Sequence, residues 1–363
     1  MRILYDHIIF ARQQYGGISK YFTELFANMP SNEVCLTSLF SDNQHLIDLH
    51  SKKQLSLFSF LPRKIKFKLQ HEIGMPYTLY NLKYTDWDIF HPTSYWEDAY
   101  SNVRSNKPVV VTAHDALYNL FNVSNPARDN LIQRQQFTCD RADKIIAISE
   151  NTKKDYIEYF KVDPNKITVI YHGIETNNIH DDDDTKLFDF EYLLYVGLRH
   201  DYKNFISFIH AFSDLSTKYP ELKVICTGTP FTKQEMELIY KLKIQGKVIS
   251  YFASELEMNY LYRNAKLFVF PSKYEGFGMP ILEAMTNKCP VALSNTSCFP
   301  EIAGDAGNYF DPYSVEDISM TIQYLLNNDS LRNEMVVKGI KRAEQFSWKK
   351  NTEEHRALYK SLL

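Results

Sequence analysis

The stretch Glu275-Gly-Phe-Gly-Met-Pro-Ile-Leu-Glu283 follows a short, strongly apolar run at residues 267–271. The apolar run predicts a buried parallel strand. Pro280, followed by apolar residues at helical spacing, predicts a helix that begins within the stretch. A strand, a glycine-bearing loop and a helix N-terminus together favour anion binding, because unpaired N–H groups and the helix dipole point to one place.

Two carboxylates, Glu275 and Glu283, bracket this predicted anion site. A site for phosphate alone would not contain them, since carboxylates repel phosphate. Ionised carboxylates are acceptor-only groups, however, and they suit the hydroxyl donors of a sugar. The local chemistry therefore predicts a ligand with both phosphate and sugar hydroxyls, which is the description of a sugar nucleotide.

The composition is that of a globular protein rather than a membrane-spanning or nucleic-acid-binding one. The 363 residues suffice for two domains, with 44% hydrophobic and 23% charged residues. The apolar runs are far shorter than the roughly 20 residues that span a bilayer. A net charge of −3 disfavours nucleic acid as a partner. The N-terminus lacks a signal-peptide pattern, so we expect a cytoplasmic location.

The five cysteines form no C-x-x-C pair, and none stands at metal-ligand spacing with a histidine. An odd number of cysteines fits a reduced chain better than a disulfide framework. We therefore expect neither structural disulfides nor a zinc site.

Predicted strands and helices alternate along both halves of the chain, which predicts an α/β fold with two doubly wound, Rossmann-like domains. A polar break at residues 175–186 contains four consecutive aspartates and predicts a linker. The predicted domains are residues 1–175 and 187–346, with 176–186 as the linker. Such domains, placed face to face, would leave a ligand cleft between the carboxyl edges of their sheets.

In the first half, Gly16-Gly17 stands at a predicted strand-to-helix turn, and His114-Asp115 follows a predicted strand at residues 108–112. Open α/β sheets bind ligands at the carboxyl ends of their strands, which makes both pairs candidate site residues. Simpler interpretations remain open: a plain turn for the glycines, and a structural histidine with a helix-capping aspartate for the second pair.

In the second half, Arg199 and Lys203 stand between a predicted strand at residues 192–196 and a helix. An arginine fork and a lysine point charge at a helix entrance suit a diphosphate. The alternative is an exposed surface cluster. The presence of the glutamate-bracketed stretch favours the diphosphate.

Residues 57–80 alternate basic and apolar side chains. This pattern suits docking on an anionic membrane surface or on a lipid-linked acceptor. A solvated basic helix with its apolar side in the core is the competing interpretation, and the sequence favours it slightly.

With these motifs in place, the chain resembles the retaining glycosyltransferases of family 4, which have the two-domain GT-B fold. The resemblance covers nearly the full length and is most specific at the E-x7-E pattern of Glu275 and Glu283. Supporting matches are Gly16-Gly17-Ile18, His172-Gly173-Ile174, the run from Val196 to Asn204, and Pro300-Glu-Ile-Ala-Gly304. The resemblance also implies that the last helix, within residues 347–363, returns to the N-terminal domain, which would be the acceptor side.

The resemblance implies roles for the charged residues. Arg199 and Lys203 would bind the donor diphosphate and stabilise the leaving nucleoside diphosphate. Glu275 would hold hydroxyls of the donor sugar, and Glu283 those of the ribose. His114 would lie against the donor sugar. The family normally needs no bound metal or cofactor, because cationic side chains take the metal's place.

The resemblance also implies contacts made by the backbone. Gly16 and Gly17 would let the N-terminal domain approach the donor phosphates closely. The backbone amides of Phe277, Gly278 and Met279 would contact sugar and phosphate. The further donor-site residues are Gly276 and Asp115, of which Asp115 would lie beside His114.

The implied reaction is hexose transfer from a nucleoside-diphosphate sugar, with retention of configuration, to a saccharide or lipid-linked oligosaccharide. The resemblance favours bacterial surface-polysaccharide synthesis and a GDP-mannose-like donor. Arg199 is followed by His200-Asp201-Tyr202 rather than by a short glycine-containing link, which departs from the family pattern. Two alternatives remain open: a sugar-nucleotide 2-epimerase of the same fold, and a non-catalytic binding subunit.

Overall fold

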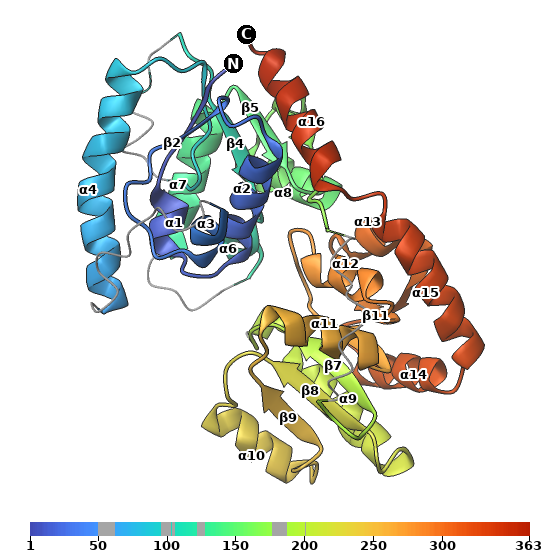
Figure 1. The fold of residues 1–363 in the computed structure, drawn as a ribbon. Helices are drawn as coiled ribbons and strands as arrows, with labels where there is room; N and C mark the ends of the chain where they lie inside the picture. Colours follow the sequence, from blue (N-terminus) through green and yellow to red (C-terminus); the bar gives the residue numbers. More distant parts are fainter. Residues whose placement is uncertain (50–61, 96–102, 104–105, 122–127, 176–186, 200) are drawn as a thin grey trace. The chain divides into compact units, whose positions relative to one another are not determined.

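The computed structural model describes residues 1–49, 62–95, 103, 106–121, 128–175, 187–199 and 201–363. The chain divides into two compact units (Figure 1). Unit 1 comprises Met1–Gly173 and Trp348–Leu363, and unit 2 comprises Ile174–Ser347. The predicted linker, residues 176–186, lies outside the described residues, and its role as a linker stays a prediction.

Unit 1 contains two parallel three-stranded sheets, in the orders β2-β1-β3 and β4-β5-β6. A single parallel bridge between Phe90 and Val109 joins β3 to the chain just before β4. The elements of unit 1 are β1 (Ile3–Tyr5), α1 (Ile8–Arg12), α2 (Gly17–Asn28), β2 (Val34–Leu36), α3 (Gln44–Leu49), α4 (Arg63–Tyr84), β3 (Ile89–Phe90), β4 (Val110–Ala113), α6 (Leu117–Leu120), α7 (Arg128–Arg141), β5 (Lys144–Ala147), α8 (Glu150–Phe160), η1 (Pro164–Lys166), β6 (Ile167–Val169) and α16 (Trp348–Lys360).

Unit 2 contains a six-stranded sheet in the order β12-β11-β10-β7-β8-β9, with every pair of neighbours parallel. Numbered from β7, this is the 3-2-1-4-5-6 order of the doubly wound Rossmann fold. The elements of unit 2 are β7 (Tyr192–Val196), η2 (Asp201–Lys203), α9 (Phe205–Lys218), β8 (Lys223–Thr227), α10 (Lys233–Lys241), β9 (Val248–Tyr251), α11 (Glu255–Asn264), β10 (Leu267–Phe270), α12 (Met279–Thr286), β11 (Val291–Ser294), α13 (Phe299–Ala303), η3 (Gly304–Ala306), β12 (Gly307–Phe310), α14 (Val315–Leu326) and α15 (Asp329–Ala343).

The predicted fold class, two doubly wound α/β units, is confirmed. The strands that position the candidate site formed where predicted, because each is a fully apolar run between turn residues. All four residues of β10 are buried, as are the first four of β7. The switch from strand to helix after β10 places residues 271–278 at the carboxyl edge of the sheet, next to the loop that follows β7.

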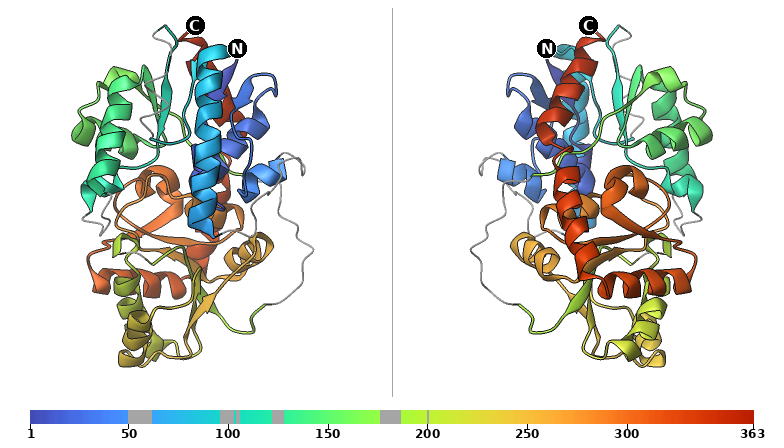
Figure 2. Two further views of the ribbon diagram at one scale, coloured as in Figure 1. Left: turned by 90° about the vertical axis from the view of Figure 1, so that its left-hand side faces the viewer. Right: turned by 90° about the vertical axis from the view of Figure 1, so that its right-hand side faces the viewer.

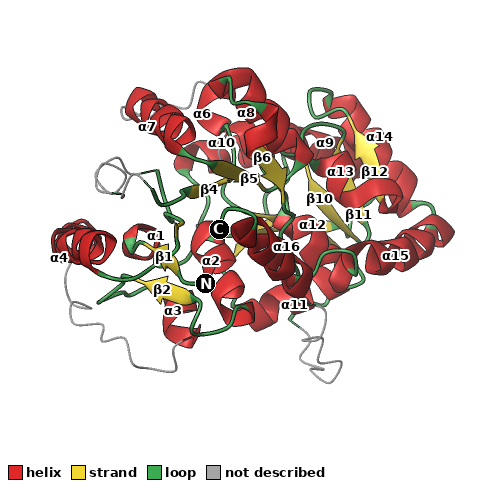
Figure 3. Ribbon diagram, turned by 90° about the horizontal axis from the view of Figure 1, so that it is seen from above, coloured by secondary structure: helices red, strands yellow, loops and turns green. Residues whose placement is uncertain are grey.

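The last helix, α16, packs on α2 and belongs to unit 1 (Figure 3), which confirms the predicted return of the chain end. Trp348, Leu358 and Tyr359 are buried in the same apolar cluster as residues of β1 and α2. At the surface, Arg356 makes a bidentate ion pair with Glu33, with N–O distances of 2.7 and 2.8 Å. The helix is thus held by apolar burial and by charge pairing.

A buried chain of hydrogen bonds joins α16 to the sheet of unit 1. His355 Nδ1 lies 2.8 Å from the Asn351 carbonyl oxygen and must donate to it, so that neutral His355 Nε2 accepts from the Tyr21 hydroxyl at 2.7 Å. On the other side, His91 Nδ1 lies 2.6 Å from the Tyr359 hydroxyl and His91 Nε2 lies 2.9 Å from Thr112 Oγ1. We call His91, His355, Tyr21, Tyr359 and Thr112 the histidine network.

Among the described residues, no helix combines the length and the apolar character that crossing a bilayer requires.

Candidate functional site

The loop between β10 and α12 carries the stretch that bears the two glutamates. Gly278 is the N-cap of α12 and adopts a left-handed conformation with φ 87°. A Cβ at this position would lie 3.1 Å from the Ile281 side chain, so that both the backbone angle and the space favour glycine. Pro280 occupies the first turn of α12, as predicted.

Lys203 and Glu275 are brought together by the ends of β7 and β10. The Lys203 Nζ lies 2.5 Å from Glu275 Oε1, and the two side chains are only 17% and 15% exposed. A backbone hydrogen bond of 2.7 Å from Lys273 N–H to the Tyr202 carbonyl ties the two loops together. A cation and a carboxylate at one sheet edge can serve both a phosphate and a sugar hydroxyl.

The backbone of Glu275 is fixed by the loop that follows β11. Ser297 Oγ accepts from the Glu275 N–H at 3.2 Å and lies 2.7 Å from the Glu275 carbonyl oxygen, to which it donates. Cys298 Sγ lies 3.2 Å from the same oxygen. The ends of β7, β10 and β11, which are neighbouring strands in the sheet, therefore determine where the Glu275 carboxylate lies.

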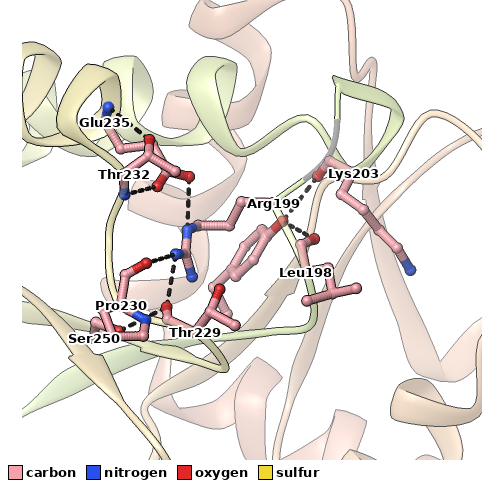
Figure 4. A network of polar contacts seen from close by, with 9 residues as sticks. Leu198, Arg199, Lys203, Thr229, Pro230, Thr232, Glu235 and Ser250 are labelled. Carbon is pink, nitrogen blue, oxygen red and sulfur yellow. Dashed lines mark hydrogen bonds and ion pairs between the residues drawn. The ribbon is translucent and has the colours of Figure 1, made fainter. Parts of the chain in front are cut away.

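Arg199 points away from Lys203 (Figure 4), although both were expected to bind the donor diphosphate. Its Nε lies 2.7 Å from Glu235 Oε1, and its Nη2 donates to the carbonyl oxygens of Thr229 and Pro230 at 2.7 and 2.9 Å. The guanidinium carbon lies 4.9 Å from the centre of the Phe231 ring. With its side chain 3% exposed, Arg199 ties the loop after β7 to the loop after β8.

Glu235 is the reason for this orientation. It belongs to the capping box of α10, in which it accepts from the Thr232 N–H while Thr232 Oγ1 accepts from the Glu235 N–H. Burial alone would raise the pKa of Glu235, but the hydrogen bonds from Arg199 and Thr232 lower it below its usual value. The ionised carboxylate therefore provides a fixed partner for Arg199 inside unit 2.

Glu283 lies in the second turn of α12, where its Oε2 accepts from the Tyr262 hydroxyl of α11 at 3.0 Å. Burial, together with the Glu283 charge, raises the pKa of Tyr262, so that this hydroxyl remains a donor. One oxygen of Glu283 is thus held by the protein, and the carboxylate keeps further acceptor positions.

In unit 1, Gly16 is the N-cap of α2 and Gly17 is its first residue. A Cβ at Gly16 would lie 2.3 Å from Gln13 Oε1, which accepts from the Ser19 N–H at 3.0 Å. Among the described residues, apart from its chain neighbours and the backbone of α2, no atom lies within 4 Å of the Cβ position of Gly17. A Cβ at Gly16 would therefore displace the end of the Gln13 side chain, whereas Gly17 leaves the start of α2 open.

His114 and Asp115 follow β4, at the carboxyl edge of the unit 1 sheet. Burial lowers the pKa of His114 to about 3, so that its imidazole is neutral, and the ring lies 5.3 Å from that of Tyr21 in an edge-to-face arrangement. Asp115 Oδ1 accepts from the Leu117 N–H at 3.1 Å, at the start of α6. The N-cap of α6 is Ala116, so that Asp115 stabilises the turn just before the helix and does not cap it.

All five cysteines are free thiols. Within the described ranges, no group of three or more histidine, cysteine, aspartate and glutamate side chains is arranged to hold a metal ion.

Sequence reasoning missed three contributors to the site: Ser297, Tyr262 and Glu235. Ser297 stands in a polar run directly after a buried strand, the same signal that identified His114, and could have been found from it. Tyr262 and Glu235 lie within helices, and nothing in the local sequence shows what they face.

Two family models match the chain. The model described as "Glycosyltransferase Family 4" matches residues 15–178, and that described as "Glycosyl transferases group 1" matches residues 180–342. The first model thus covers most of unit 1, and the second covers most of unit 2.

Curated relatives include mannosyltransferases. The chain is 36% identical to "O-antigen chain mannosyltransferase B" of Escherichia coli over 47% of this chain and 46% of that protein. It is 27% identical to "O-antigen chain mannosyltransferase RfbU" of Salmonella typhimurium over 62% of this chain and 67% of that protein. The match thus spans less than half the length of the first of these relatives.

Solved structures share the fold over the whole length. The Anabaena protein HepE, solved in complex with UDP-glucose, superposes with a TM-score of 0.76 at 16% identity, covering 99% of this chain and 100% of that one. Sucrose-phosphate synthase from Thermosynechococcus elongatus gives a TM-score of 0.74 at 17% identity, covering 100% and 99%. At these identities the likeness establishes the fold alone.

Proposed function

Because the chain belongs to the glycosyltransferases of family 4 and has their GT-B fold, we propose that it is a retaining, metal-independent hexosyltransferase. The donor is a nucleoside-diphosphate sugar, with GDP-mannose favoured because the curated relatives include O-antigen mannosyltransferases. The acceptor is a saccharide or lipid-linked oligosaccharide in the synthesis of a surface polysaccharide.

The observation that carries this proposal is the pairing of Lys203 with Glu275 at the edge of the unit 2 sheet. In the proposed complex Lys203 turns from the carboxylate to the donor diphosphate and stabilises the charge that develops on the leaving group. Glu275 is then available to accept hydrogen bonds from the hydroxyls of the donor sugar. The contact holds both side chains in place, which reduces the reorganisation that substrate binding requires.

The other predicted site residues belong either to unit 2 or to unit 1. Glu283, held by Tyr262, accepts from the ribose hydroxyls, and the backbone at the start of α12, at Gly276, Phe277, Gly278 and Met279, contacts sugar and phosphate. From unit 1, neutral His114 faces the donor sugar. We assign Arg199 a supporting role, because its side chain is buried against Glu235.

The test combines donor binding with product analysis. A thermal-shift panel of GDP, UDP, ADP and dTDP should show one stabilising base, because a ligand of the native state raises stability by mass action. The matching sugar nucleotide, incubated with an oligosaccharide acceptor, should release nucleoside diphosphate and form a glycoside of the donor's anomeric configuration, detected by NMR.

Three outcomes of the same assay would overturn the proposal. An isomerised sugar nucleotide without a glycoside would identify an epimerase. An inverted glycoside would contradict retention. Absence of stabilisation by every nucleotide and of any turnover would indicate a non-catalytic binding protein.

We also propose that α4 contacts the inner face of the plasma membrane. The helix lies at the edge of unit 1 (Figure 2), and Ile73, Tyr77, Tyr80 and Tyr84, spaced i, i+4, i+7 and i+11, are 37–62% exposed. Four large apolar side chains on one solvent-facing side of a helix favour an interfacial site. The N-terminal part of the basic stretch, residues 57–61, lies outside the described residues.

The expected result is co-sedimentation of the protein with anionic lipid vesicles, weakened at least about tenfold by the double change Tyr80→Ser and Tyr84→Ser. Tyr240→Ser and Tyr324→Ser, on exposed tyrosines of α10 and α14, provide the matched control. Equal sedimentation of the two double variants, or none by the unmodified protein, would contradict a membrane role for α4.

A further inference from the structure

Unit 1 contains a cavity of about 300 Å³ that none of the donor-site roles accounts for in full. It lies between the end of α1, the segments that follow β3 and β4, and α7. His114 closes one part of it, while Arg12, Ser94 and Gln135 line the remainder. Its volume is at the lower end of the range for small-ligand pockets, roughly 300–1,000 Å³, and suits a single sugar unit.

Gln135 on α7 contributes the buried polar atom from which we infer that the cavity binds a ligand. The residue is 4% exposed, and its Nε2 donates to the Asp115 carbonyl oxygen at 3.2 Å and to the Tyr156 hydroxyl at 3.4 Å. These two contacts fix the orientation of the amide. Its Oε1 is buried and has no hydrogen-bond partner within the described part of the chain. A buried acceptor without a partner is unfavourable, so this atom selects a ligand that donates a hydrogen bond.

The charged and polar groups that line the cavity favour a neutral ligand that carries hydroxyl groups. Arg12 donates to Ser94 Oγ at 3.3 Å and brings one positive charge. Asp115 brings a carboxylate, and Gln135 brings its buried carbonyl oxygen. Because two of these three groups are hydrogen-bond acceptors, an anionic ligand would meet repulsion where a polyhydroxyl ligand would donate.

The apolar part of the lining fits the same ligand. Phe22, Leu117 and Leu131 line the cavity alongside its polar groups. A pyranose ring carries C–H faces as well as hydroxyls, so that it can cover the apolar wall while its hydroxyls meet the polar one.

We propose that this cavity binds the terminal sugar of a neutral saccharide acceptor, and that Gln135 determines specificity by accepting a hydrogen bond from one of its hydroxyls. The inference rests on the proposed glycosyl transfer, whose acceptor it describes. It assigns recognition of that sugar to unit 1 alone, through α7 and the end of α1.

The test measures sugar binding separately from catalysis. Saturation-transfer NMR of the full chain with the methyl glycosides of mannose, glucose and galactose should detect at least one of them, and methyl glucuronide should bind more weakly. Gln135→Leu should weaken the neutral glycoside, and raise the KM for an oligosaccharide acceptor, by about tenfold or more. The thermal shift caused by the nucleotide should stay unchanged.

Two further variants separate recognition from folding. Leu131→Trp fills the cavity without altering the hydrogen bonds of Gln135 and should also abolish glycoside binding. Gln133→Leu makes the same chemical change on the exposed face of α7 and should have no effect. Unchanged glycoside binding in both Gln135→Leu and Leu131→Trp, or preferred binding of methyl glucuronide, would overturn the inference. Loss of the nucleotide shift in the unmodified protein would instead refute the proposed function.

Discussion

Replacing Lys203 by alanine is expected to lower kcat by about 10²- to 10³-fold, the size of effect seen when one charge-stabilising group is removed from an active site. Its ammonium group lies at the carboxyl edge of the unit 2 sheet, mostly covered and 2.5 Å from Glu275. Without it, the leaving diphosphate loses a preorganised cation, and the Glu275 carboxylate is left without its partner. Steady-state kinetics with the donor identified by the nucleotide panel would measure the effect.

Two comparison variants make this result specific to Lys203. Lys233→Ala removes an exposed lysine from α10, whose ion pair with Glu237 lies at the surface, and should leave kcat unchanged. Glu283→Gln keeps an acceptor for Tyr262 but removes the charge that the ribose would meet. It should mainly raise the donor KM. Near-normal turnover of Lys203→Ala would refute the role of Lys203, and a lowered kcat with unchanged KM in Glu283→Gln would refute the ribose contact.

The sequence predicted the sheet of unit 2 well because its strands are apolar runs bounded by polar turns. The predicted limits of β7, residues 192–196, agree with the structure, and β10 ends one residue earlier than the predicted 267–271. The strands β2 and β12 were not predicted. The strand β2 is an apolar run of only three half-buried residues, and β12, Gly-Asn-Tyr-Phe, has neither a continuous apolar run nor a clean alternation.

The sequence predicted which loops form the candidate site, but it did not predict in which direction their side chains point. Position at the end of a parallel strand predicted Lys203 and Glu275 as site residues, and in the structure their side chains lie 2.5 Å apart. The same rule placed Arg199 with them, yet its side chain turns to Glu235, a residue 36 positions further along the chain. Local spacing cannot reveal such a partner, because Arg199 meets Glu235 only when pairing of β7 with β8 brings the loops after these strands together.

Unit 1 is expected to unfold in mild acid, as its histidines take up protons. Burial lowers the pKa of His355 and His7 to about 4 and that of His114 to about 3, and burial also lowers the pKa of His91 and His172. The unfolded chain, with histidine pKa values near about 6.5, binds more protons than the native one below that pH. Stability is therefore complete above about pH 6.5 and falls as the pH drops towards 4.

The expected loss in the free energy of unfolding at acidic pH is large. Each such histidine contributes a slope of about 1.4 kcal/mol per pH unit once the unfolded form is protonated. Several together approach the whole stability of a domain, about 5–15 kcal/mol. Asp6 opposes the trend, because burial raises its pKa to about 6 and native stability falls as pH rises towards that value. Tyr5, Tyr21 and Tyr359, which face the histidines, stay neutral because burial raises their pKa.

The measurement uses the tryptophans, all three of which lie in the sequence range of unit 1, so that their fluorescence reports this unit alone. Urea unfolding at pH 7.0, 6.0 and 5.0 should show a steep loss of stability. His355→Gln should reduce the pH slope, because one proton-binding group is removed. Tyr21→Phe should lower stability at every pH without reducing the slope, because it removes a hydrogen bond to His355 but no titrating histidine. A fluorescence transition independent of pH between 7 and 5 would contradict the predicted loss of stability of unit 1 in acid.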